Sequence, residues 1–269
     1  MAGHPLATAG PDMSLPGGAV SWLTDGANWR GANGIVDLTI DHFEVTGLSL
    51  LIAAAVALPL GVGIGHRRRG GRLISIIGNA GRAIPPLALI IILAAEPTFG
   101  VNTRTAVVAL AVFAVPPMLI NAYTGVRQVD PDALDAARGL GMSGWQLLTR
   151  VELPLSLPLV ATGIRIAVLQ TFATATIAAF VGTRTLGTII QLNQATNMEQ
   201  AVLAGAFIVA VEALILDSLL ARVQSALRPG PRIQHFTWGQ HRPALDTLAA
   251  EADAAASSTP GPAIEVAHA

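Results

Sequence analysis

Residues 130–154 read DPDALDAARGLGMSGWQLLTRVELP, a charged stretch that lies between two long apolar segments. Asp130 is a good helix N-cap, and Pro131 suits the first position of a helix. The stretch therefore predicts a short helix that reaches about Arg138 and stops at the glycines of GLG.

A second short helix is predicted from Ser143, because Gln146 follows three residues later in a capping-box pattern. We expect it to run to about Arg150 and to end before ELP. Apolar or small residues at spacings of three or four predict one face across the helix pair: Leu134, Ala137, Gly141, Trp145 and Leu148. Isolated helices this short are marginal in water, so the face either packs on the protein's own spans or docks a soluble partner.

The chain as a whole has the composition of a membrane protein. Of its 269 residues 52% are hydrophobic and 12% are charged, against about 25% charged in soluble domains. A bilayer core of ~30 Å needs ~20 helical residues. Five segments have that length: 43–65, 73–95, 105–126, 158–181 and 200–223. We therefore predict an all-α, polytopic membrane fold with five transmembrane helices.

These spans divide the chain into three parts. Residues 1–41 are predicted to form an extracytoplasmic N-terminal segment, with tryptophans near the membrane–water boundary. Residues 42–228 form the transmembrane domain, in which 127–157 is the charged loop. Residues 229–269 are polar and of low complexity, and we expect a disordered cytoplasmic tail.

The arginines predict the orientation, because cytoplasmic flanks are enriched in basic residues. With the N-terminus outside, eleven arginines fall in inner segments: Arg67, Arg68, Arg69, Arg72, Arg127, Arg138, Arg150, Arg222, Arg228, Arg232 and Arg242. Three fall in outer segments: Arg30, Arg104 and Arg184. We therefore expect the N-terminus outside and the C-terminus in the cytoplasm.

The charged stretch resembles the cytoplasmic signature of bacterial ABC importer permeases. That signature is Glu-Ala-Ala, three residues, Gly, nine residues, Ile, one residue, Leu-Pro. The matching positions in this chain are Asp135, Ala136, Ala137, Gly141, Val151, Leu153 and Pro154. Asp135 and Val151 depart conservatively, and the spacing matches in full. The resemblance implies that these residues couple the chain to a separate ATPase.

Roughly residues 20–228 also resemble the permeases of importers for glycine betaine, carnitine, choline and proline betaine, of the binding-protein-dependent, MetI-like type. AIPPLALIIIL and ELPLSLPLVATGIRIAV are among the similar stretches. The outer segment VGTRTLG departs from the glycine-rich GAGGLG of that family at Thr183, Arg184 and Thr185.

The resemblance implies a complex of two permease chains, two cytoplasmic ATPases and an external substrate-binding protein. The second permease is this chain or a paralogue. ATP-driven closure of the ATPases would move the loop and switch the spans between inward-facing and outward-facing states. The chain contains no GxxxxGK[ST] sequence that would cradle nucleotide phosphates, which agrees with ATP and Mg²⁺ being bound by the partner. No cofactor is expected in this chain.

Two other classes compete with this interpretation. An intramembrane enzyme would need a catalytic constellation, and neither HExxH nor GxSxG occurs. A secondary transporter would need buried ionisable residues as an ion path. The candidates are Arg82, Arg165, Glu212 and Asp217. Arg82 and Glu212 lie deepest, and they either form a structural pair or line the pathway.

Two spans carry proline pairs, at Pro85-Pro86 and at Pro116-Pro117. Each pair frees backbone groups that neighbouring helices or water must satisfy. Each is therefore either a packing kink or a hinge in a broken helix that lines a pathway.

Overall fold

The computed structural model describes residues 14–227, except for the side chain of Arg82. This part of the chain is helical, and no strand occurs in it. Its α-helices are α1 Leu15–Thr24, α2 Ile35–His66, α3 Gly71–Ala83, α4 Pro86–Ala95, α5 Thr103–Arg127, α6 Pro131–Gly139, α7 Gly144–Leu147, α8 Leu153–Ala175, α9 Gly187–Ala195 and α10 Glu199–Ala226. Two 3₁₀ segments, η1 Gly26–Trp29 and η3 Ile177–Val181, and one π-helical segment, η2 Leu148–Glu152, connect them.

The spans agree with the predicted membrane architecture. Within residues 14–227, four helices are long and apolar enough to cross a bilayer: α2, α5, the continuous run 144–175 that contains α8, and α10. A fifth span results if α3 and α4 are taken together. The prediction of an all-α polytopic fold is therefore confirmed.

The two proline pairs behave differently. Pro85 and Pro86 separate α3 from α4, and the helix axes bend by 86° between residues 71–81 and 86–95. Pro116 and Pro117 lie inside an unbroken α5. A Cβ added at Gly81 would lie 2.3 Å from the Pro116 ring, so α3 approaches α5 closely there. The first pair breaks a helix, and the second is a packing contact.

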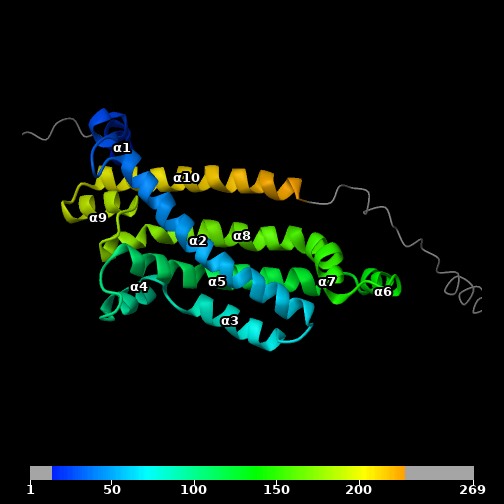
Figure 1. Cartoon of the computed structure of the whole chain (residues 1–269). Coiled ribbons are helices and arrows are strands. Elements are labelled where there is room, and N and C mark those ends of the chain that lie inside the picture. The colour runs from blue at the N-terminus through cyan, green and yellow to red at the C-terminus, as the bar shows by residue number, and fades with distance from the viewer. Residues whose placement is uncertain (1–13, 228–269) are drawn as a thin grey trace, which may run out of the picture. The chain divides into compact units, whose positions relative to one another are not determined.

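Helix α5 packs against both α2 and α8, which also contact each other (Figure 1). The contacts are made largely by small residues. A Cβ at Gly61 of α2 would lie 2.7 Å from the Leu119 carbonyl, and one at Gly163 of α8 would lie 2.9 Å from the Pro117 carbonyl. Small residues allow this close approach of backbones, which is how helices associate where lipid removes the hydrophobic driving force.

Several predicted boundaries shift. Helix α2 begins at Ile35 instead of residue 42, and the fourth span begins before residue 158 and gives way to η3 after Ala175. The tryptophan-containing segment ahead of α2 forms α1 and η1, where the Trp29 indole nitrogen donates to the Leu23 carbonyl at 2.7 Å. The predicted tail at 229–269 lies outside the described residues.

Candidate functional site

Figure 1 shows α6 and α7 at the end of the bundle opposite to α1 and α9. Helix α6 is capped as predicted, since the Asp130 side chain accepts a hydrogen bond from the Asp132 amide at 2.9 Å. The helix ends in a turn in which Gly141 has a φ of +79°. The Gly141 amide donates to the Arg138 carbonyl at 2.9 Å. Glycine adopts this left-handed conformation without steric cost, and it closes α6 in the usual way.

Helix α7 begins with the predicted capping box. The Ser143 hydroxyl accepts from the Gln146 amide at 3.4 Å, and the Gln146 side chain accepts from the Ser143 amide at 2.9 Å. The prediction that this helix ends before ELP is wrong. A single π-helical turn, η2, carries the chain directly into α8, and Pro154 lies in the first turn of α8.

The loop has its own apolar core. Val129, Leu134, Ala137 and Leu147 are buried together, and Met142 and Val151 pack against them. The prediction of one continuous face is therefore wrong: Leu134 and Ala137 face this core, whereas Trp145 does not. The reason is the turn at Gly141, which changes the direction of the chain and breaks the helical phase between α6 and α7.

The opposite side of the loop is open. Leu140 is 81% exposed and Trp145 is 72% exposed, and both flank the turn at Gly141. Asp135 and Ala136 are exposed on the same loop, and the Arg138 guanidinium donates to the Asp135 carboxylate at 2.8 Å. Large apolar side chains held in the open by a capped, packed loop are typical of a docking surface. We call Leu140, Gly141 and Trp145 the open face of the loop.

The last residue of η2 carries a buried charge. Glu152 is 1% exposed, and its Oε2 lies 2.5 Å from Nδ1 of His66, the last residue of α2. Leu153 and Pro154 follow it in the first turn of α8. The end of α2 is therefore joined to the residues that connect the loop to α8.

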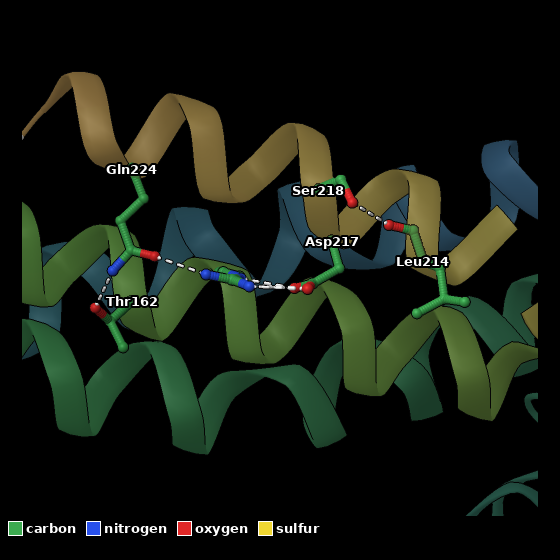
Figure 2. Close-up of polar contacts among 6 residues, drawn as sticks. Thr162, Leu214, Asp217, Ser218 and Gln224 are labelled. Atoms are coloured by element: carbon green, nitrogen blue, oxygen red, sulfur yellow. Dashed lines mark hydrogen bonds and ion pairs between the residues drawn. The ribbon is translucent and has the colours of Figure 1, made fainter. Parts of the chain in front are cut away.

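A second polar cluster joins α8 to α10 (Figure 2). The Arg165 guanidinium donates to both carboxylate oxygens of Asp217, from Nε to Oδ1 at 2.7 Å and from Nη2 to Oδ2 at 2.8 Å. Arg165 Nη1 also donates to Gln224 at 3.2 Å, and the Gln224 amide donates to the Thr162 hydroxyl at 2.6 Å. Paired charges of this kind are the form in which ionisable residues are tolerated inside membranes.

Glu212 and Arg82 are the two ionisable residues predicted to lie deepest in the spans. Thr39 of α2 donates to Oε1 of Glu212 at 2.9 Å, while Oε2 of Glu212 is buried and has no hydrogen-bond partner among residues 14–227. Arg82 lies in α3, and its side chain is outside the described residues. A pair between Arg82 and Glu212 therefore stays a prediction.

The segment 182–187, which departs from the family pattern, is held by hydrogen bonds and an ion pair. Thr183 and Thr185 are buried, and the Thr185 hydroxyl accepts from the Gly187 amide at 3.2 Å. Arg184 pairs with Asp41 of α2 at 3.1 Å and donates to the Ala32 carbonyl. Arg184 thereby ties the 182–187 segment to α2 and to the residue Ala32 before it.

The arrangement of spans and loop agrees with what sequence comparison finds. The family described as "Binding-protein-dependent transport system inner membrane component" matches residues 55–229. This chain belongs to that family. It is a transport permease subunit and not itself an enzyme, since in ABC importers of this family the ATPase is a separate partner.

Several characterised proteins are similar to the permease. The "Carnitine transport permease protein OpuCD" of Listeria monocytogenes serotype 1/2a is 38% identical over 189 residues, which are 70% of this chain and 84% of the relative. The "Glycine betaine/carnitine/choline transport system permease protein OpuCB" of Bacillus subtilis is 31% identical over 71% of this chain and 87% of its own length.

Solved structures share the fold. An inward-facing structure of the MetNI methionine ABC transporter superposes with a TM-score of 0.64 at 19% identity. The match covers 72% of the permease and 96% of the solved chain. The helical arrangement is thus that of ABC importer permeases.

Sequence reasoning does not identify the pairs His66–Glu152 and Arg165–Asp217. Glu152 occupies the unspecified position between Val151 and Leu153 of the signature. The one available signal is that Glu152 is a lone acidic residue at the apolar beginning of a span, where it needs a partner. Arg165 and Asp217 are candidate ionisable residues of the spans, and the structure pairs them with each other.

Proposed function

We propose that the permease forms the translocation path of an ATP-driven importer for a quaternary-ammonium compatible solute, and that its open face docks on the cytoplasmic ATPase. The observation that carries the docking proposal is the exposure of Leu140 and Trp145 on a loop whose spacing matches the coupling signature. The cap at Asp130, the capping box and the loop core hold these side chains in place before any partner binds, which lowers the entropic cost of docking.

The coupling residues contribute in different ways in this proposal. Gly141, Asp135 and Ala136 lie on the exposed part of the loop, where they can approach a partner. Ala137 and Val151 pack inside the loop, and Leu153 and Pro154 begin α8. The second group acts by holding the first in position.

The substrate class rests on the relatives, which are named for the transport of carnitine, choline and glycine betaine. Selection among these solutes is assigned to the external binding protein. The permease is proposed to act as a dimer, with itself or a paralogue, because α10 leaves much of its surface, including the small residues Ala206 and Ala210, open for another helix.

We propose an orientation with the N-terminus outside and the loop in the cytoplasm. The chain contains no cysteine, so single cysteines can be introduced without background. A cysteine at Ser21 should react with an impermeant thiol reagent added to intact cells, and a cysteine at Ser143 should react only after the cells are opened. The reverse pattern would contradict the orientation.

Uptake by the reconstituted transporter tests the proposed function. The permease, its ATPase and its external binding protein are placed in liposomes, and uptake of labelled choline, carnitine and glycine betaine is measured. We expect uptake of at least one solute only with ATP on the ATPase side. Uptake that follows an ion gradient without ATP would favour a secondary transporter instead.

A further inference from the structure

The end of α2 contacts the loop formed by α6, α7 and η2, which we call the coupling loop. His66 is the last residue of α2, and its Nδ1 meets Glu152 at the end of η2. A Cβ added at Gly144, the first residue of α7, would lie 3.8 Å from the His66 Nε2. One imidazole therefore contacts Glu152 at one end of the segment 144–152 and lies near Gly144 at the other.

The contact between His66 and Glu152 is polar and lies where burial makes an unpaired polar group destabilising. Glu152 is almost completely buried, and among residues 14–227 the His66 ring is the side chain that pairs with it. The His66 side chain is 29% exposed, so it can reach water when it loses its partner. Glu152 cannot, and a buried carboxylate without a partner is strongly destabilising.

The contact also lies on the route from the open face to the spans. The open face leads into α7, which leads through η2 into α8 without a break. A displacement of α7 would move α8 directly, because the two are one continuous helix. Helix α2 is not continuous with the loop, since His66 and Glu152 are 86 residues apart in the chain.

We propose that the His66–Glu152 pair is the contact that transmits a displacement of the coupling loop to α2. This inference rests on the proposed docking of the loop on an ATPase. It makes His66 and Glu152 positioning residues: they touch neither nucleotide nor substrate, and they make α2 move together with α8. A short, buried and directional contact suits this role, because α2 cannot slide past η2 without exposing a charge to an apolar surrounding.

The test separates the contact from its contribution to stability. His66→Ala removes the contact and leaves a buried charge. The double variant His66→Ala with Glu152→Gln removes the contact and the charge together, so its abundance in the membrane should recover. His66→Asn is the conservative variant, because the asparagine amide nitrogen occupies nearly the place of the imidazole Nδ1 and can donate to Glu152.

Each variant is reconstituted as the full transporter, and the number of solute molecules imported per ATP hydrolysed is measured. We expect this ratio to fall about tenfold in His66→Ala, which is within the range by which mutations along a contact network change coupling. It should stay low in the double variant although abundance recovers, and it should return in His66→Asn.

Two results would overturn the proposal: a normal ratio in His66→Ala, or a double variant in which the ratio recovers together with abundance. The second result would mean that the pair only neutralises a buried charge. All these variants keep Leu140 and Trp145, so the ATPase should co-purify with each of them. Failure of the docking proposal would appear instead as normal ATPase binding after the open face itself is changed.

Discussion

The two sides of the coupling loop have similar amino acids and opposite environments. The inner side consists of Leu134, Ala137, Leu147 and their neighbours, which bury one another and contact Val151 of η2. The open face presents Leu140 and Trp145 to the surroundings. Apolar area removed from water stabilises the fold, whereas apolar area left in water is available for a partner.

The same contrast separates the two polar pairs of this region. Glu152 is buried and meets His66, whereas Asp135 and Arg138 are 72% and 55% exposed. An exposed pair is screened by water and contributes ~0–1 kcal/mol, while the loss of one partner from a buried pair costs about 3–5 kcal/mol. We therefore expect the inner side to determine whether the loop is formed, and the open face to determine what it binds.

Leu134→Ala should have the largest effect on stability. Leu134 is almost completely buried in the loop core, and removing such a side chain costs about 2–5 kcal/mol. We expect a lower unfolding midpoint for the purified permease and easier proteolysis of residues 130–154. The matched control is Leu140→Ala, which should leave the midpoint unchanged because Leu140 is already in water. Equal losses in both variants would remove the distinction between the two sides.

Gly141→Val should have an intermediate effect. Gly141 has a positive φ, and a β-branched residue in that conformation costs about 1–3 kcal/mol. The control is Gly139→Val two residues earlier, where φ is not positive and where an added Cβ meets no atom within 4 Å, as at Gly141. We expect substrate-stimulated ATP hydrolysis and uptake to fall together in Gly141→Val and to change little in Gly139→Val. Similar losses in both would show that the turn conformation is not what matters.

Asp135→Ala should have the smallest effect. Its ion pair with Arg138 is exposed, and exposed pairs of this spacing on a helix contribute a few tenths of a kcal/mol, up to ~1 kcal/mol. Uptake and the unfolding midpoint should stay close to those of the unchanged permease. A loss of ATPase binding as large as that expected for the open face would mean that Asp135 contacts the partner directly.

The sequence was sufficient to predict the features that depend on neighbouring residues. The cap at Asp130 and the capping box at Ser143 are local, and both are present. Of the two alternatives for Pro85-Pro86, a packing kink or a broken helix, the structure has the broken helix. A turn needing glycine at position 141 was also predicted, because a helix end requires a left-handed residue there.

Features that depend on how helices pack could not be predicted in the same way. The Gly141 turn rotates α7 relative to α6, so periodicity along the chain no longer shows which residues share a face. His66 meets Glu152 and Arg165 meets Asp217 only because α2, α8 and α10 pack as they do. A lone charge at the beginning of a span shows that a partner is needed, and it does not show which residue is the partner.

The affinity of the ATPase for a permease in which Trp145 is changed to Ala tests the central claim most directly. The matched control is Leu214→Ala, since Leu214 of α10 is 67% exposed but lies away from the loop. Exposed aromatic anchors contribute ~2 kcal/mol or more at interfaces, so we expect Trp145→Ala to weaken ATPase binding at least tenfold and to leave the unfolding midpoint unchanged. Leu214→Ala should bind the ATPase normally. Unchanged ATPase binding in Trp145→Ala would contradict the proposal that the open face is the docking surface.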